Sequence, residues 1–198
     1  FLHKAIEEDL FEVYYQPVYS IQEQRFITLE ALSRLHHPEL GWIAPDAFIQ
    51  VAEKNHLIDQ ITELQLRRVC RFMKENEIAL VGVKNVKVNL SPLDLMRHDC
   101  GEHLIHILDE YGLPYSRFQF EITETVATEY TSSLSRLVEI FEKAGIGLCL
   151  DDFGSGYSSM MSLSTLPFDV VKIDKSLIDL IGDKQGNVVL EAVIHLAK

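Results

Sequence analysis

No apolar run in this sequence approaches the ~20 residues that a membrane-spanning helix needs, and its first residues lack the pattern of a signal peptide. The chain has three cysteines, odd in number and far apart, which excludes a disulfide framework or a zinc-binding spacing and fits a reducing compartment. A formal net charge of −12 argues against a general binder of DNA, RNA or membrane surfaces, which would need a basic face. These absences predict a cytoplasmic domain in which any phosphate ligand is met by locally held cations.

The composition is that of one globular domain spanning residues 1–198. Hydrophobic residues make up 47% of the chain, enough to bury a large core, and no linker, low-complexity tract or internal repeat divides it. The chain starts abruptly at Phe1. We therefore expect a piece of a longer protein, which could carry a sensor or a membrane anchor upstream.

Strand and helix patterns alternate along the chain. The β-rich runs predict strands over residues 12–19, 25–35, 84–90, 117–123, 146–151 and 169–174. Apolar spacing predicts helices over residues 1–9, 45–54, 58–77, 101–111 and 132–143, near Ser158, and from about Gln185 onward. Only a short polar stretch separates the first two strands, so these should form an antiparallel hairpin. The strand–helix units that follow predict parallel strands with helical crossovers.

Polar side chains occupy one phase of the later strands. Lys87 and Asn89 alternate with valines, and Glu121 alternates with Phe120 and Ile122. Parallel strands covered by helices on both faces are normally almost continuously apolar, so a polar phase predicts a wet or metal-filled interior such as a barrel mouth. Active sites of (β/α)8 barrels lie at the carboxyl ends of the strands. The polar residues expected there are Glu30, Asn89, Glu121, Asp151, Asp152 and Lys172.

The adjacent carboxylates Asp151 and Asp152 are the strongest local signal. They follow an apolar strand and precede Gly154 and Gly156, which permit the backbone to turn. Two neighbouring carboxylates repel unless a cation or a proton lies between them, which makes a metal the natural interpretation. With the other strand-end oxygens they suit Mg²⁺ or Mn²⁺ better than zinc. The alternative is an ordinary capped loop between a strand and a helix.

Several blocks of residues occur along the chain in a particular order. They are Tyr15-Gln-Pro-Val18, Glu30-Ala-Leu-Ser-Arg34, Pro45 with Phe48-Ile49 and Ala52-Glu53, Val88-Asn-Leu-Ser91, Glu121-Ile-Thr-Glu124, Asp151-Asp-Phe-Gly-Ser-Gly-Tyr-Ser-Ser159 and Lys172-Ile-Asp-Lys175. Over essentially the whole chain, these blocks resemble the EAL domain family of cyclic di-GMP-specific phosphodiesterases.

The resemblance implies an α/β fold, a modified (β/α)8 TIM-type barrel with an antiparallel first strand. It also implies metal-dependent hydrolysis of cyclic di-GMP to linear pGpG at a site with two Mg²⁺ or Mn²⁺ ions. The implied metal ligands are Glu30, Asn89, Glu121, Asp151 and Asp152. The implied catalytic residues are Lys172, which would orient or help activate the attacking water, Glu124, which would steady the loop after Asp151, and Asp152. The implied substrate contacts are Gln16, Leu32, Arg34 and Asp174.

The sequence departs from the family pattern at its end. Family members continue into a strand with an Ala-Glu-Gly-Val-Glu-like block and then a Gln-Gly-like block, and neither block occurs here. The Glu is expected to be a metal ligand or general base. The strands predicted above also fall short of the eight in the barrel. We therefore expect the last two strands to be absent and these 198 residues alone to be inactive.

Two other classes of function are open at this stage. One is a catalytically inactive cyclic di-GMP receptor. Inactive members of the family usually lose metal ligands, whereas each metal-ligand position that this chain contains keeps the expected residue. The other is a protein-interaction module, which would not need oxygen ligands at strand ends. The resemblance further implies cyclic di-GMP as partner without DNA or RNA, a homodimer, and an upstream sensor or GGDEF-type domain.

Several polar residues have a simpler interpretation. His98, His103 and His106 could suggest a second metal centre, but their segment lies away from the strand ends, so we expect solvated surface side chains. Lys87 shares the phase of Asn89 and is either a phosphate contact or the partner of a neighbouring carboxylate.

Overall fold

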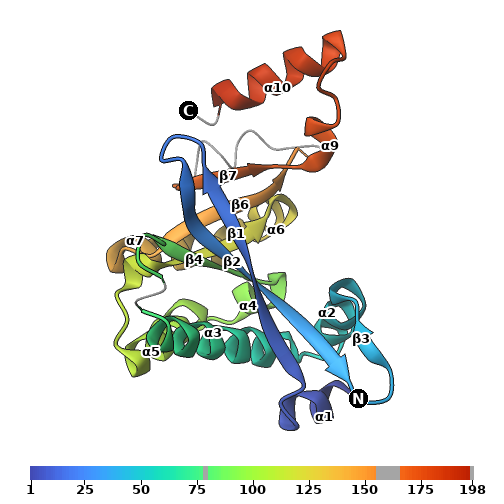
Figure 1. The fold of residues 1–198 in the computed structure, drawn as a ribbon, viewed down its shortest axis with the longest axis vertical. Helices are drawn as coiled ribbons and strands as arrows, with labels where there is room; N and C mark the ends of the chain where they lie inside the picture. The colour runs from blue at the N-terminus through green and yellow to red at the C-terminus, as the bar shows by residue number, and fades with distance from the viewer. Residues whose placement is uncertain (78–79, 155–165, 197–198) are drawn as a thin grey trace.

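The structure, a computed structural model, describes residues 1–77, 80–154 and 166–196 (Figure 1). Its frame is a seven-stranded sheet with the order β1-β2-β4-β5-β6-β7 and with β3 paired to β2. The strands are β1 (Phe11–Ser20), β2 (Arg25–His37), β3 (Gly41–Ile43), β4 (Asn85–Asn89), β5 (Phe118–Thr123), β6 (Gly147–Phe153) and β7 (Val170–Ile173).

The first two strands form the long antiparallel hairpin that crosses the molecule in Figure 1. Phe11 pairs with Leu35 near the base of the hairpin, and Gln16 lies opposite Glu30 in its middle. Pro17 is tolerated because β1 stands at one end of the strand order, where a missing N–H does not interrupt the sheet. The hairpin therefore sets Gln16 beside the first expected metal ligand.

The other neighbours in the strand order, from β2-β4 to β6-β7, are parallel. The helices are α1 (Leu2–Glu7), α2 (Pro45–Lys54), α3 (Ile58–Glu75), α4 (Pro92–Met96), α5 (Cys100–Tyr111), α6 (Glu124–Glu129), α7 (Thr131–Ala144), α9 (Lys175–Ile178) and α10 (Lys184–Leu196), with a short 3-10 helix η1 at Tyr115–Arg117. Because parallel strands share one direction, the carboxyl ends of β4, β5 and β6 meet at one edge of the sheet.

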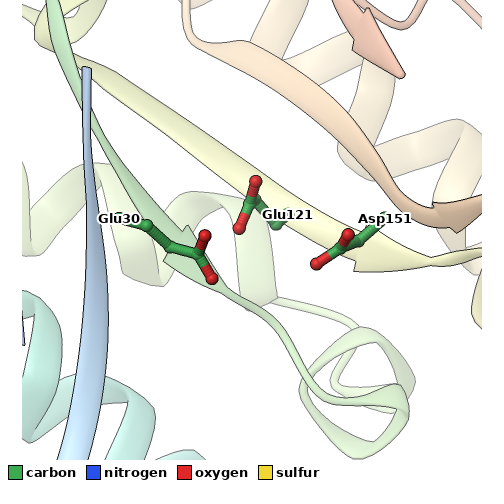
Figure 2. A group of neighbouring side chains, drawn as sticks. All are labelled: Glu30, Glu121 and Asp151. Atoms are coloured by element: carbon green, nitrogen blue, oxygen red, sulfur yellow. The ribbon is translucent and has the colours of Figure 1, made fainter. Parts of the chain in front are cut away.

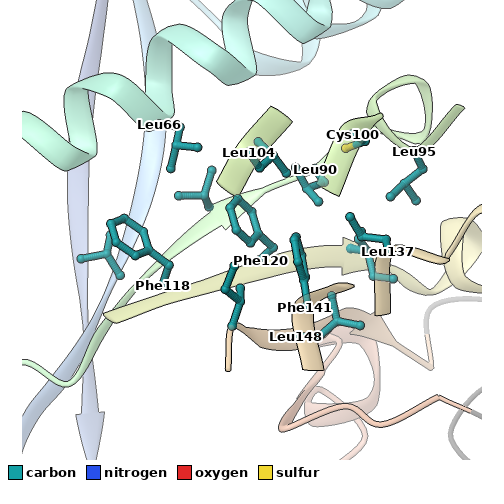
Figure 3. Packing of buried hydrophobic residues seen from close by; sticks show 14 of the residues in the cluster. Leu66, Leu90, Leu95, Cys100, Leu104, Phe118, Phe120, Leu137, Phe141 and Leu148 are labelled. Carbon is teal, nitrogen blue, oxygen red and sulfur yellow. The ribbon is translucent and has the colours of Figure 1, made fainter. Parts of the chain in front are cut away.

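The main core packs one phase of the parallel strands against helices (Figure 3). Phe118 and Phe120 of β5 are buried in it, and Phe120 stacks on Phe141 of α7 with ring centroids 5.0 Å apart. Each apolar side chain of this size contributes about 1.5–3 kcal/mol when fully buried. This packing fixes the phase of the strand, so that Glu121, between Phe120 and Ile122, must point to the opposite face.

Several short elements have no counterpart among the predicted ones, namely β3, α4, α6, α9 and η1. Each spans three to six residues, too few to show a repeating pattern. Strand β6 continues to Phe153, two residues beyond its expected end. The helix expected near Ser158 lies outside the described residues.

The mostly parallel sheet with an antiparallel first pair confirms the predicted α/β fold class. Within the described ranges, β1 and β7 stand at opposite ends of the strand order, and the sheet is not closed into a barrel. None of the helices described combines the length and the apolar character needed to cross a membrane.

Candidate metal centre

Three carboxylates from three strands converge at the carboxyl edge of the sheet. Glu30 of β2, Glu121 of β5 and Asp151 of β6 point into one space (Figure 2), where each offers an oxygen within 4.8 Å of the others. The parallel register explains this, because Asn89 pairs with Glu121 across β4-β5 and Thr123 pairs with Asp151 across β5-β6. Three carboxylates this close repel one another unless a cation or a proton lies between them.

Lys172 of β7 places a cation among them. Its Nζ lies 2.8 Å from Asp151 Oδ2, 3.1 Å from Glu30 Oε2 and 3.3 Å from Glu121 Oε2. Burial opposes the charged form of Lys172, but its hydrogen bond to Asp151 and the nearby carboxylates raise its pKa overall. The oxygens of the three carboxylates thus accommodate a positive charge. Because all of these candidate ligands are oxygen atoms, they fit a hard divalent metal ion.

Glu121 is the least exposed of the three carboxylates. Its other oxygen, Oε1, accepts a hydrogen bond of 2.9 Å from Lys87 Nζ, which also lies 3.4 Å from Cys149 Sγ. Burial raises the pKa of Cys149 to about 12, so the thiol is neutral at physiological pH. Of the two interpretations of Lys87, the structure shows the carboxylate partner.

Asp152 stands apart from the group of three. Its backbone has a φ of 55°, a left-handed conformation that aspartate tolerates better than most residues, and its N–H donates to Asp151 Oδ1 at 2.9 Å. Burial, followed by the charges of Asp151 and Asp174, raises the pKa of Asp152. The backbone departs from regular strand geometry at Asp152, inside β6, where the register with β7 shifts between Leu150 and Phe153. Gly154, just after the strand, has a φ of +94°, and Gly156 lies outside the described residues.

Glu124 ties the next loop to the sheet. It is the first residue of α6, it is buried, and its Oε2 accepts the N–H of Gly154 at 2.9 Å. This hydrogen bond links the end of β5 to the loop after Asp151.

A cavity of about 270 Å³ opens beside the carboxylates. Residues from β2, α2 and the end of β4 line it, including Leu32, Arg34, Phe48, Glu53, Asn89 and Ser91. Asn89 is exposed and Arg34 half-buried, so both can reach a ligand. A larger cavity of about 540 Å³ lies at the amino ends of β4 to β7, away from the carboxylates.

Buried polar contacts support the floor of the smaller cavity. Ser91 Oγ donates to Glu53 Oε1 at 2.8 Å, while Asp94 Oδ2 accepts the Ser91 N–H at 2.8 Å and the Thr62 hydroxyl at 2.9 Å. Burial raises the pKa of Asp94 to about 6. We did not predict this network, although the Ser-x-x-Asp spacing of a capping box signals it.

The remaining expected residues have local partners. Asp174 caps α9 by accepting the Ser176 N–H at 2.8 Å, which lowers its pKa. His103 Nε2 lies 2.9 Å from Glu63 Oε2, and His98 contacts Arg136. Neither histidine belongs to a three-residue metal-ligand group among the described residues.

In (β/α)8-barrel proteins the active site lies at the carboxyl ends of the parallel strands. The three carboxylates lie at this position, so the fold and the site are those of a barrel-related α/β protein with a candidate metal site. The family model for the EAL domain matches residues 2–198. The chain belongs to the EAL domain family.

Two relatives show the similarity in detail. The chain is 34% identical over 198 residues to the cyclic di-GMP phosphodiesterase NbdA of Pseudomonas aeruginosa, covering all of this chain and 25% of NbdA. It is 29% identical over 198 residues to the oxygen sensor protein DosP of Escherichia coli, again covering all of this chain and 25% of that protein. The chain thus spans about a quarter of the length of these curated relatives.

Solved structures share the fold. The PaMucR phosphodiesterase in complex with c-di-GMP is 31% identical, with a TM-score of 0.89 over 98% of this chain and 79% of that one. The FimX EAL domain of Pseudomonas aeruginosa bound to c-di-GMP is 22% identical, with a TM-score of 0.87 over 98% of this chain and 78% of that one. The second similarity supports the fold alone.

Proposed function

We propose that this chain is the phosphodiesterase domain of a longer protein and that it hydrolyses cyclic di-GMP to linear pGpG with Mg²⁺ or Mn²⁺. The observation that carries the proposal is the convergence of Glu30, Glu121 and Asp151 around a cation position. Cyclic di-GMP is proposed as the substrate because the chain belongs to the EAL family and is similar to NbdA and PaMucR, whose descriptions specify this dinucleotide.

The proposed metal ligands follow the strand ends. Glu30, Asn89, Glu121 and Asp151 would hold one ion, while Asp151 and Asp152 would share a second. When bound, two such metal ions lower the pKa of the water that they hold and neutralise charge on the phosphoryl oxygens. Burial, followed by the charges of Asp151 and Asp174, raises the pKa of Asp152, and a second cation there would relieve the repulsion between these carboxylates.

Lys172 and the loop residues would act on the water and the scissile phosphate. The Nζ of Lys172 lies within 3.3 Å of all three carboxylates. It would exchange one of these contacts for the attacking water and orient that water as a hydrogen-bond donor. Glu124, through its bond to Gly154, would hold the loop after Asp151 in place.

The substrate would lie along β1 and β2 and in the cavity beside the carboxylates. Gln16 is paired with Glu30 in register, and Leu32 and Arg34 line the cavity. Arg34 would supply the local positive charge that an acidic chain needs for a dinucleotide phosphate. Asp174 accepts the Ser176 N–H through Oδ1, and because a carboxylate can accept further hydrogen bonds, Asp174 would contact the substrate while it still caps α9.

We infer the setting of the domain from the length of its relatives. Because NbdA is about four times as long as the matched region, we propose an upstream sensor or GGDEF-type domain. We also propose a homodimer and a cytoplasmic location, with any membrane anchor upstream.

Glu121→Gln and Asp151→Asn in the full-length protein test the reaction. Each change removes a negative ligand, so turnover of cyclic di-GMP with Mg²⁺ should fall on the order of 1,000-fold or more, as several kcal/mol of charge stabilisation is lost. Chromatographic quantitation of pGpG measures this. Glu139→Gln, which changes an exposed carboxylate paired with Lys143, should leave turnover unchanged. Near-normal turnover of either ligand variant, or of the wild type after thorough chelation, would contradict the proposal.

A receptor without catalysis is the second candidate, since Lys172 already neutralises part of the carboxylate cluster without a metal. In that case the full-length protein would bind cyclic di-GMP in calorimetric titration and release no pGpG in Mg²⁺.

A further inference from the structure

Lys87 is a buried cation directly beneath the carboxylate cluster. It lies in β4, where it pairs in register with Glu30 on one side and Gln119 on the other. Its side chain is 5% exposed, which is unusual for lysine and requires a charged partner. The proposed reaction assigns it no role.

The partner of Lys87 is one oxygen of one carboxylate. Lys87 Nζ lies 2.9 Å from Glu121 Oε1, whereas Glu121 Oε2 faces Lys172 Nζ at 3.3 Å. The two oxygens of Glu121 are therefore divided, with one directed into the protein and the other toward the open side of the cluster. The Glu121 side chain is 0% exposed, so bulk water does not compete with either contact.

The two lysines around Glu121 are not equivalent. Lys172 is 28% exposed and shared among three carboxylates. Among the described residues, Glu121 is the one carboxylate with which Lys87 forms an ion pair. Its other contact is the sulfur of Cys149, 3.4 Å from Nζ. Lys87 is thus the cation that can stay on Glu121 when the open side receives another positive charge.

We propose that Lys87 is a positioning residue that holds Glu121 by Oε1 and so makes it offer Oε2 alone to a divalent cation. The inference rests on the metal site of the proposed function. It goes beyond that site because Lys87, which is not itself a metal ligand, would determine which oxygen of Glu121 binds the metal.

Two effects of Lys87→Met have opposite signs, so the experiment can decide between them. Removing a nearby positive charge would by charge alone tighten the binding of a cation. Removing the group that orients a ligand loosens metal binding, typically 10–100-fold. The proposal requires the second effect to win. We expect the Kd for Mn²⁺, measured by electron paramagnetic resonance without nucleotide, to rise at least about 10-fold.

Lys84→Met is the matched control. Lys84 immediately precedes β4 and pairs with Glu23 on the surface, so its loss removes the same charge from the same segment without touching Glu121. Its Kd for Mn²⁺ should stay within about 2-fold of the wild type. Circular dichroism melts in chelator check that every variant is folded.

A double-mutant comparison separates positioning from a general structural role. In a Glu121→Gln background, Lys87→Met should change the Kd for Mn²⁺ by less than about 3-fold, because the group through which Lys87 acts is already altered. If Lys87→Met does not fold, Lys87→Gln replaces it, since its shorter amide removes the charge but stays polar, and at least about 3-fold weaker binding is expected.

The outcomes are distinct. Weakened Mn²⁺ binding that depends on Glu121 supports the proposal. An unchanged or lower Kd in a folded Lys87 variant, or equal losses with and without Glu121, overturns it. A wild type that binds no Mn²⁺ overturns both this inference and the proposed metal site, whereas normal Mn²⁺ binding without hydrolysis overturns the proposed reaction alone.

Discussion

Gly154 determines the path of the chain directly after the carboxylates. Its φ is +94°, and a Cβ built there would come within 2.2 Å of Leu177 Cδ1. Its N–H is the donor to Glu124. A side chain at this position would therefore face unfavourable backbone geometry and a steric clash at once.

Gly154→Ala should lower the free energy of unfolding by about 2–4 kcal/mol, from left-handed strain together with overpacking. Urea unfolding followed by circular dichroism measures the loss. Gly145→Ala is the matched control, because Gly145 has a φ of +74° and no atom within 4 Å of the added Cβ, so it should lose only about 1 kcal/mol. Equal losses in the two variants would show that Leu177 does not constrain the loop.

Side-chain partners across the sheet were the part of the site least accessible from the sequence. Alternation in the strands placed Glu121 in the polar phase, because its neighbours Phe120 and Ile122 are buried in the core. The division of its two oxygens between Lys87 and Lys172 depends on strand register and on a residue 51 positions away. Alternation in single strands does not carry that information.

At the scale of elements, the junction of β4 and α4 shows how a buried acid organises a short helix. Asp94 closes the capping box on Ser91 and accepts the Thr62 hydroxyl of α3. It is 4% exposed. The junction thus carries an ionisable group whose burial favours the protonated form.

Asp94→Asn should flatten the pH dependence of stability. Burial raises the pKa of Asp94 from 3.8 to about 6 in the folded protein, against the hydrogen bonds from Ser91 and Thr62. Between about pH 4 and 6 the folded state therefore binds more protons, and the unfolding free energy falls as pH rises, by at most about 1.4 kcal/mol per pH unit. Asparagine removes this contribution. Urea unfolding across this range measures the difference in slope.

The control for this prediction is Asp99→Asn. Asp99 is exposed and pairs with Arg97, which lowers its pKa, so its stabilising contribution is lost only as pH falls below the ordinary aspartate range. Its variant should follow the wild-type slope between pH 4 and 6. If the unfolding free energies of Asp94→Asn and the wild type change with pH in parallel, the raised pKa of Asp94 would be contradicted.

Long helices followed from periodicity, whereas the short helices α4, α6 and α9 did not. Helix α5 begins within one residue of its predicted start, since its apolar residues recur over several turns. Helix α4, at five residues, follows from a cap and not from a period. The irregularity in β6 falls at Asp152, whose φ is 55°, where the register between β6 and β7 shifts between Leu150 and Phe153.

At the scale of the whole molecule, the candidate ligands join distant parts of an acidic chain. Glu30, Glu121 and Asp151 come from β2, β5 and β6 and span 121 positions in the sequence. An unfolded chain with a net charge of −12 offers no such cluster. A divalent ion should therefore bind the folded state far better than the unfolded one, and its binding free energy should add to stability.

Saturating Mg²⁺ should raise the melting temperature of the protein. At 100 times Kd the added stability is about 2.7 kcal/mol, which corresponds to a shift of about 5–10 °C for a domain of this size. Differential scanning calorimetry over a Mg²⁺ series measures the shift. Ca²⁺ should also raise the melting temperature, because it takes oxygen ligands. It should support little hydrolysis, since its looser coordination activates water less well.

The shift should require the cluster and not the overall charge. Glu30→Gln should lose most of it, whereas Glu139→Gln, which removes the same charge from the surface of α7, should keep it in full. If both variants respond to Mg²⁺ as the wild type does, the ion acts by screening the acidic surface as a whole. In that case the converging carboxylates of β2, β5 and β6 would be held together by Lys172 alone.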